Sequence, residues 1–173
     1  PEVLRSDEAP VQQIIQRGDA ASLFELPVLT QHEHEPGPYL TAAHATTYDP
    51  DTGIDNTAIQ RCWVQEPRRM TYFPYPASHN ARNVRKFHAR GEPAPVAFWI
   101  GHHPAVLLGT QAKLRYPESH WSAAGGVIGA PLRLDFWCHG RAEMLSELSF
   151  LQDRRKSVGQ IPATNRFVLH PYG

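Results

Sequence analysis

Residues 49–61 read D-P-D-T-G-I-D-N-T-A-I-Q-R, and this stretch carries the strongest structural signal in the chain. Its first five residues predict a tight turn, because Asp, Pro and Gly each favour turn conformations. The turn leads into a strand that carries Asn56 and Arg61. An amide oxygen is a ligand for a hard cation, and a guanidinium pairs with a carboxylate or phosphate. The stretch therefore indicates a binding site, and the alternative is an ordinary hairpin whose arginine lies in solvent.

Asn56 and Arg61 are five residues apart. On an ideal strand, an odd separation places two side chains on opposite faces. We predict that both side chains point into one cavity, which requires a bulge or an irregular turn between them.

The patterns around this stretch predict an α+β fold. Strand patterns cover residues 39–47, 58–65, 70–75, 95–100 and 132–138, and we expect the first three to form an antiparallel meander. Helix patterns cover residues 81–90, 103–114, 118–128 and 142–154, with a short helix around Val11, Ile14 and Ile15, whereas residues 27–38 predict a loop. Strands dominate first and helices are interspersed later. This order favours an α+β sheet or barrel over a doubly wound domain.

Composition excludes several classes of protein. The 173 residues have the length of one domain, and 17 Lys and Arg balance 17 Asp and Glu, so the chain has no broad attraction for nucleic acid or an anionic membrane. Cys62 and Cys138 are too few for a disulfide framework and have no metal-binding spacing, which favours the reducing cytoplasm. No apolar run approaches the roughly 20 residues that span a bilayer.

Five segments follow one another along the chain: P-Y-L-T at residues 38–41, the 49–61 stretch, His79, P-V-A-F-W-I-G-H-H-P at 95–104 and A-A-G-G-V-I-G-A-P-L at 123–132. Their order and spacing resemble those of the UbiD-like decarboxylases. The resemblance covers roughly residues 9–134. The 49–61 motif is specific, and the other segments support it together. No glycine-rich dinucleotide fingerprint, G-x-S-x-G elbow or phosphate-binding GK[ST] motif competes with this assignment.

The resemblance implies a single prenylated-FMN-binding domain over residues 1–173, folded as a flavin-reductase-like split β-barrel with flanking helices and without the family's C-terminal region. It implies that a divalent cation, most often Mn²⁺, helps to hold the cofactor phosphate. Asn56 would be a metal ligand, and His79 falls where the family places its next metal-site residue. The residues implied to line the cofactor are Thr41, Ile59, Gln60 and Arg61. Arg61 would also face the substrate carboxylate.

The sequence departs from the family pattern at two places. His120 stands where the family has a metal-binding Glu, and Glu118 lies two residues earlier. Residues i and i+2 of a helix point about 200° apart, so only one of them can reach a common site. A set of Asn56, His79 and His120 is rich in nitrogen, which favours Mn²⁺, Fe²⁺ or Zn²⁺ over Mg²⁺. In the alternative interpretation, His120 only begins a helix and binds no metal.

The second departure concerns the proton donor. The family's acidic E-G-P-F-G-E motif does not occur, and its nearest counterpart is L-H-P-Y-G at residues 169–173, with Leu169 in place of the first Glu. The resemblance therefore identifies no proton donor in this chain.

The remaining histidine-rich segments have simpler interpretations. H-E-H-E at residues 32–35 has the spacing of a metal site on a strand, but the prolines that follow favour a loop. His102 and His103 are expected to cap the helix that Pro104 begins.

The sequence thus predicts a UbiD-type carboxy-lyase, or a subunit of one, that acts on aromatic or α,β-unsaturated carboxylic acids. The expected partners are a UbiD-like protein in a homo- or hetero-oligomer and a flavin prenyltransferase that supplies the cofactor. Burial of the helical face formed by Met144, Leu145, Leu148 and Leu151 against the barrel or a second chain fits this picture. The rival functions are a catalytically silent accessory or assembly subunit and, less favoured, an FMN-dependent reductase.

Overall fold

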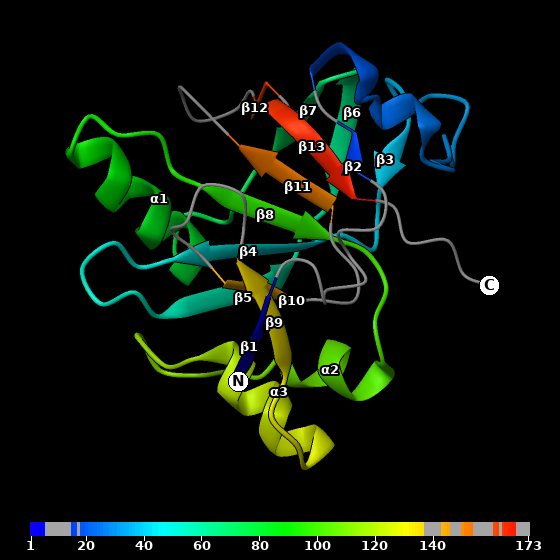
Figure 1. The fold of residues 1–173 in the computed structure, drawn as a ribbon. Helices are drawn as coiled ribbons and strands as arrows, with labels where there is room; N and C mark the ends of the chain where they lie inside the picture. Colours follow the sequence, from blue (N-terminus) through cyan, green and yellow to red (C-terminus); the bar gives the residue numbers. More distant parts are fainter. Residues whose placement is uncertain are drawn as a thin grey trace.

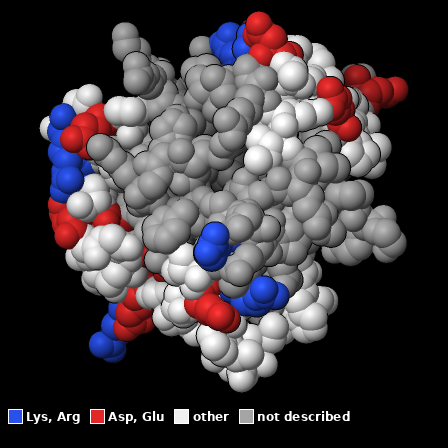
Figure 2. Space-filling model, in the orientation of Figure 1, with Lys and Arg blue, Asp and Glu red and all other residues white. Residues whose placement is uncertain are grey.

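A computed structural model describes residues 1–5, 15–16, 18–136, 143–145, 150–153, 161–162 and 164–168. These residues form a mixed α+β structure, as the sequence predicts, with three sheets and three α-helices (Figure 1). No helix in these ranges is long and apolar enough to cross a membrane. On the face that Figure 2 shows, the visible basic and acidic side chains lie interspersed rather than in areas of one sign, in keeping with the balanced composition.

The six-stranded sheet forms the centre of the structure. Its order is β2 (Ile15–Gln16), β13 (Thr164–Val168), β11 (Phe150–Asp153), β8 (Val96–Trp99), β4 (His44–Tyr48) and β5 (Asp55–Ile59). All of its neighbouring strands are antiparallel. Strand β5 therefore lies at one edge of this sheet.

Two smaller sheets complete the strand arrangement. One contains β1 (Glu2–Leu4), β9 (Arg133–Phe136) and β10 (Glu143–Leu145), and β1 and β9 run parallel. The other contains β12 (Ile161–Pro162), β7 (Arg69–Tyr72), β6 (Cys62–Glu66) and β3 (Tyr39–Leu40). Short 3₁₀ helices span Gly18–Ala20 and Leu23–Glu25.

The three α-helices cover the central sheet from different sides. Helix α1 (His79–Ala89) packs on β4 and β5, whereas α2 (Pro104–Gly109) and α3 (His120–Ile128) pack on each other below the sheet in Figure 1. Strand β8 is buried along its whole length between two apolar clusters. Phe98 belongs to one cluster and Trp99 to the other, because successive side chains of a strand point to opposite faces.

The predicted meander is confirmed in part, because β3, β6 and β7 pair antiparallel in that order. The remainder of the first two segments belongs to the central sheet, because the chain changes sheet at two neighbouring places. Strand β3 pairs with β6, but after a bend at residues 41–42 the chain continues as β4 and pairs with β5. The expected strand 58–65 is likewise broken at Gln60 and Arg61, where the chain leaves the central sheet for β6. The Gln60 N–H donates to the Ala43 carbonyl (2.8 Å), which joins the two crossing points. This is the irregularity predicted between Asn56 and Arg61.

The expected helix over residues 142–154 is also wrong where the structure describes it. Met144 and Leu145 lie in β10 and Leu151 in β11, whereas Leu148 falls outside the described residues. Strand β11 pairs with β8 on one side and β13 on the other, and this pairing outweighs the helical spacing of the apolar residues.

The structure confirms most of the other predicted helices and strands that it describes. Helices α1 and α3 and strand β8 are confirmed within two residues of their expected bounds, whereas α2 ends five residues early, at Gly109. Ile15 belongs to β2 instead of a helix, and Val11 and Ile14 lie outside the described residues. Cys138 lies outside them too, beyond the described end of β9.

Candidate functional site

A cavity of about 510 Å³ lies along the free edge of β5. Its walls come from β5, from the start of α1, from the segment after α2 and from the start of α3. The lining residues are Asn56, Thr57, Ala58, Ala77, Ser78, His79, Thr110, Gln111, Ala112, Lys113, Leu114 and His120. Asn56, His79 and His120, which are far apart in the sequence, therefore share one cavity.

Each of the two histidines is the first residue of a helix capped by a serine. The Ser78 hydroxyl accepts from the Ala81 N–H (3.2 Å) at the start of α1. The Ser119 hydroxyl accepts from the Ser122 N–H (3.0 Å) at the start of α3. A serine side chain in this position satisfies a free N–H of the first turn. The caps thus fix where His79 and His120 enter the cavity.

The adjacent residues Asp55 and Asn56 connect β5 to the two helices. The buried Asp55 carboxylate accepts from the Ser119 hydroxyl (2.5 Å) and from the N–H groups of His120 (2.9 Å) and Trp121 (3.0 Å). Asn56 Nδ2 donates to Asn80 Oδ1 in α1 (2.6 Å). Side chains alternate along a strand, so Asp55 holds α3 while Asn56 meets α1.

Asp55 is a residue that the sequence did not single out. Burial raises its pKa, while the hydrogen bonds from Ser119, Trp121 and His120 act in the opposite direction. The D-N pair inside the 49–61 motif was the available signal, but the partners of Asp55 lie more than 60 residues away.

The environment of His120 favours a neutral imidazole. Burial lowers its pKa, the Ala112 carbonyl raises it, and the nearby His79 lowers it again, with a net lowering. Nδ1 of His120 is buried and has no hydrogen-bond partner among the described residues. A neutral imidazole with a free nitrogen is the form that binds a metal ion.

The cavity therefore fits a cation. Among the described residues, the Asn56 side chain makes a hydrogen bond only through its nitrogen, so no described residue donates to its Oδ1. An amide oxygen, the free nitrogen of His120 and the ring of His79 supply ligands of the kind that Mn²⁺, Fe²⁺ or Zn²⁺ accepts. Within the described ranges, no group of three or more His, Cys, Asp and Glu side chains is placed to hold a metal ion, so a cation in this cavity would depend on the Asn56 amide beside the two histidines.

The other residues implied to line the cofactor lie near the crossing points of the chain. Thr41 is exposed in the bend between β3 and β4, Ile59 ends β5, and Gln60 and Arg61 form the crossing from β5 to β6. They do not line the cavity at the β5 edge, so the structure does not bring Arg61 into the cavity of Asn56 as predicted, although the chain is irregular between them. Arg61 is exposed and makes no hydrogen bond or ion pair with a described residue.

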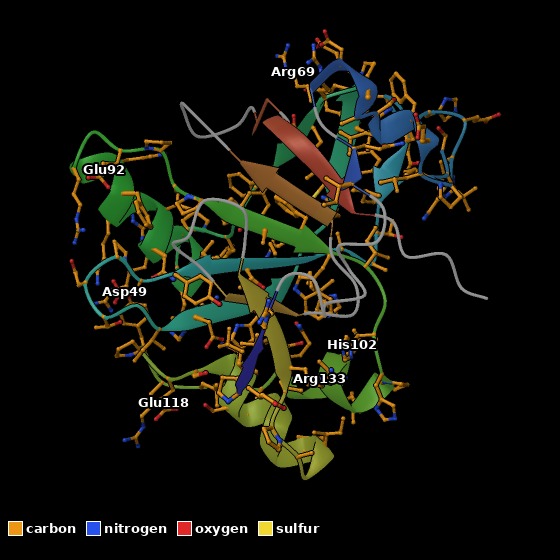
Figure 3. The ribbon with its side chains drawn as sticks, in the orientation of Figure 1. Asp49, Arg69, Glu92, His102, Glu118 and Arg133 are labelled. Carbon is orange, nitrogen blue, oxygen red and sulfur yellow. The ribbon has the colours of Figure 1, made fainter. Side chains whose placement is uncertain are left out.

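Glu118 does not share the position of His120. Its carboxylate accepts from the Arg115 N–H (2.9 Å) on the exposed loop before α3, where Figure 3 shows it. Only His120 of the two residues lines the cavity.

The H-E-H-E segment is an exposed loop, as the neighbouring prolines predict, with Glu35 accepting from the Gln31 N–H (2.8 Å). The expected capping by His103 is confirmed, because its Nδ1 accepts from the Ala105 N–H (3.2 Å) at the start of α2.

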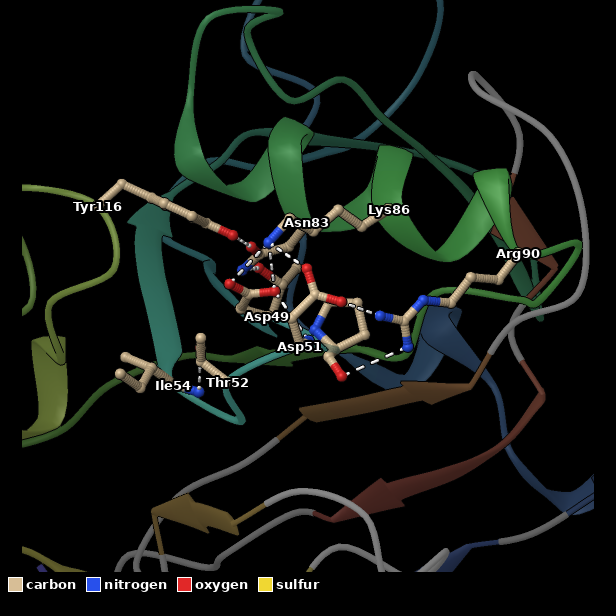
Figure 4. Close-up of polar contacts among 10 residues, drawn as sticks. Asp49, Asp51, Thr52, Ile54, Asn83, Lys86, Arg90 and Tyr116 are labelled. Atoms are coloured by element: carbon tan, nitrogen blue, oxygen red, sulfur yellow. Dashed lines mark hydrogen bonds and ion pairs between the residues drawn. The ribbon is translucent and has the colours of Figure 1, made fainter.

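The turn of the motif is anchored to α1 by ion pairs (Figure 4). Lys86 bridges the carboxylates of Asp49 (2.7 Å) and Asp51 (2.8 Å), and Arg90 pairs with Asp51. Burial alone would raise the pKa of Asp49, but the bonds with Lys86, Tyr116 and the Asp51 N–H outweigh it and lower the pKa to about 2. These contacts join the turn before β5 to the helix that begins at His79.

Replacing Asp49 by asparagine is expected to destabilise the protein by about 1 kcal/mol at pH 6 and by less at pH 3. A carboxyl whose pKa is lower in the folded state stabilises the fold above its ordinary pKa of 3.8, and this contribution is lost as the pH falls towards about 2. Urea unfolding at both pH values measures the difference. Asp51→Asn, at a half-exposed position beside the same lysine, is the control and should change stability less. An Asp49→Asn effect that is equal at the two pH values would contradict the ion pair.

Comparison with known proteins places these features in a family. Residues 2–139 match the model of the family described as UbiD, the 3-octaprenyl-4-hydroxybenzoate carboxy-lyase Rift-related domain. A phenolic acid decarboxylase of Streptomyces sp. (strain D7) is 31% identical over 133 residues, which is 73% of this chain and 28% of the relative. The anhydromevalonate phosphate decarboxylase of Methanothermobacter thermautotrophicus is 37% identical over 98 residues, 57% of this chain and 23% of the relative.

A solved structure has the same fold. It is an evolved dimeric form of the UbiD-class enzyme HmfF from Pelotomaculum thermopropionicum in complex with prFMN, with a TM-score of 0.84 and 27% identity. The match covers 96% of this chain and 44% of that chain. The chain thus spans less than half the length of the relatives that it matches.

Proposed function

The chain belongs to the UbiD family, and we propose that it forms the cofactor-binding domain of a UbiD-type carboxy-lyase for aromatic or α,β-unsaturated carboxylic acids. The observation that carries the proposal is the convergence of Asn56, His79 and His120 on one cavity beside β5. The decarboxylases among the relatives and the prFMN held by the HmfF structure support the same assignment.

In this proposal Asn56, His79 and His120 would hold a divalent cation, with Mn²⁺ as the first candidate, and the cation would help to bind the phosphate of prenylated FMN. Thr41, Ile59, Gln60 and Arg61 line the remainder of the cofactor. Prenylated FMN, when bound, supplies the electron sink for the electron pair that departing CO₂ leaves behind. The exposed guanidinium of Arg61 is available for a bidentate pair with the substrate carboxylate.

We further infer that the sheets belong to a split β-barrel and that residues 1–173 act as one domain of this type. The change of sheet at residues 41–42 and 60–61 supports this inference, because strands that pass from one sheet to another close the corners of such folds. A carboxylic acid group from a UbiD-like partner, in a homo- or hetero-oligomer, supplies the proton that replaces CO₂ and is left as a carboxylate. A flavin prenyltransferase supplies the cofactor.

Expression beside a flavin prenyltransferase tests the proposal. We expect the purified protein to carry prenylated FMN, identified by mass and absorbance, and to release CO₂ from a phenolic acid once a UbiD-like partner is present. Bound cofactor without CO₂ release from any acid in a panel would support the silent accessory subunit instead. Oxidation of NADH with FMN would support the reductase, and absence of any bound flavin would contradict the proposal.

A further inference from the structure

Asn80 lies behind the cavity and connects three structural elements. It follows His79 in α1, and its side chain is completely buried. Its Oδ1 accepts from the Thr47 hydroxyl (2.7 Å) and from Asn56 Nδ2 (2.6 Å). Its Nδ2 donates to the Ala45 carbonyl (3.0 Å).

These contacts determine which way each amide faces. The Ala45 carbonyl can only accept a hydrogen bond, so Asn80 must turn its nitrogen towards β4. Its oxygen then faces Asn56, which must offer its nitrogen in return. The oxygen of Asn56 is left on the other side of its own amide.

The next groups along the network agree with this direction. The Thr47 hydroxyl donates its one proton to Asn80 and accepts from Asn83 Nδ2 (3.0 Å). The Asn83 oxygen in turn accepts from the Tyr116 hydroxyl (2.9 Å). Each donor in this chain of contacts thus meets an acceptor. With the Asn80 amide flipped, its nitrogen would face the Asn56 nitrogen and its oxygen would face the Ala45 carbonyl, so a donor would face a donor and an acceptor an acceptor.

We propose that Asn80 is a positioning residue that fixes the Asn56 amide with its oxygen towards the cavity at the β5 edge, ready to bind a divalent cation. This proposal rests on the proposed function, because it assigns Asn80 a part in the same cation site. Asn80 itself does not line the cavity and acts only through Asn56. Its buried bonds to β4 also stabilise the fold, so the test must separate the two roles.

The test is a double-mutant cycle read by Mn²⁺ binding. Free Mn²⁺ is measured by electron paramagnetic resonance with the intact protein, both with the metal alone and with added FMN. Asn80→Ala is expected to raise the Kd for Mn²⁺ about 10- to 100-fold, the usual effect of losing a residue that orients a metal ligand. In an Asn56→Ala background the same change should have no further effect on the Kd, because its only route to the cation has been removed.

A matched control accounts for the loss of buried hydrogen bonds. Thr46 lies beside Thr47 on β4, is buried, and bonds with Thr57 (2.8 Å) and Trp99 (3.0 Å) on the opposite face of the sheet. Thr46→Val is expected to lower the melting temperature while changing the Kd for Mn²⁺ less than about threefold. If Asn80→Ala also leaves the Kd within threefold of wild type, or weakens binding equally in the Asn56→Ala background, the positioning role is overturned.

A measurement on the unchanged protein covers the case in which Asn80→Ala does not fold. The side-chain amide protons of Asn56, assigned by their loss in Asn56→Ala, should exchange with water much more slowly than those of a free amide, because the nitrogen donates to Asn80. Exchange at the free-amide rate would show that the nitrogen faces the cavity and would overturn the proposal. Wild-type protein that fails to bind Mn²⁺ would instead contradict the proposed function, whatever the state of Asn80.

Discussion

Replacing His79 by alanine is expected to lower the rate of CO₂ release at least about 100-fold. His79 is fixed at the start of α1 by the Ser78 cap and shares the cavity with Asn56 and His120. In the proposed cation site, removing one of the three ligands would leave the cation with two protein contacts, and a bound cation typically contributes several kcal/mol to catalysis. Each 1.4 kcal/mol corresponds to a factor of ten in rate.

The experiment measures CO₂ release and bound Mn²⁺ in the reconstituted protein. His88→Ala is the matched control, because His88 lies in the last turn of the same helix and does not line the cavity. It should retain both the metal and the activity within about twofold. Full activity in His79→Ala would refute the place of His79 in the cation site, and equal losses in the two variants would point to damage to α1 instead.

A methyl group at Gly109 should cause a large loss of stability. The added carbon would lie 2.3 Å from Cα and 2.9 Å from Cβ of Ala124 in α3. The first of these atoms belongs to the backbone, so relief requires α2 and α3 to move apart. Overpacking of a core typically costs about 1–3 kcal/mol, and we expect Gly109→Ala to lie at or above the upper end of this range.

For Gly126→Ala, in the same pair of helices, we expect the opposite change in the free energy of unfolding. Apart from its chain neighbours and the backbone of its own helix, no atom of a described residue lies within 4 Å of the position that its methyl would take, and Gly126 is in the interior of α3. The change should stabilise the protein by about 0.5–1 kcal/mol. Urea unfolding of both variants measures the difference, and two effects of the same sign would contradict the close approach of α2 to α3. Gly109→Ala should also weaken Mn²⁺ binding, because His120 begins the displaced helix.

Short-range sequence patterns correctly predicted those parts of the fold whose conformation depends mainly on residues within the same segment. The turn at residues 49–53, α1, α3 and β8 follow from turn residues, serine caps and a short apolar run. The strands at Met144, Leu145 and Leu151 do not, because their conformation depends on partners in β8, β9 and β13. The change of sheet at Gln60 likewise depends on the Ala43 carbonyl, 17 residues earlier.

The same distinction applies to the site. Asn56 and His79 were predicted as neighbours through the family motif, and His120 through its position in the sequence. Asp55 and Asn80 were not, although each makes three polar contacts, because a buried carboxylate on a strand and a buried amide in a helix leave no periodic pattern. Their roles depend on groups that only the folded chain brings together.

The serine-capped helix starts have an electrostatic consequence for ligand binding. Helices α1 and α3 both begin at the cavity, so two macrodipoles direct their positive ends at the same space. A dication that enters alone is opposed by both fields, whereas an anion that accompanies it is attracted by them. The cation and the anion should therefore bind cooperatively. By thermodynamic reciprocity, each should raise the affinity of the cavity for the other by the same factor. The fold thereby favours capture of a cation and an anion as a pair.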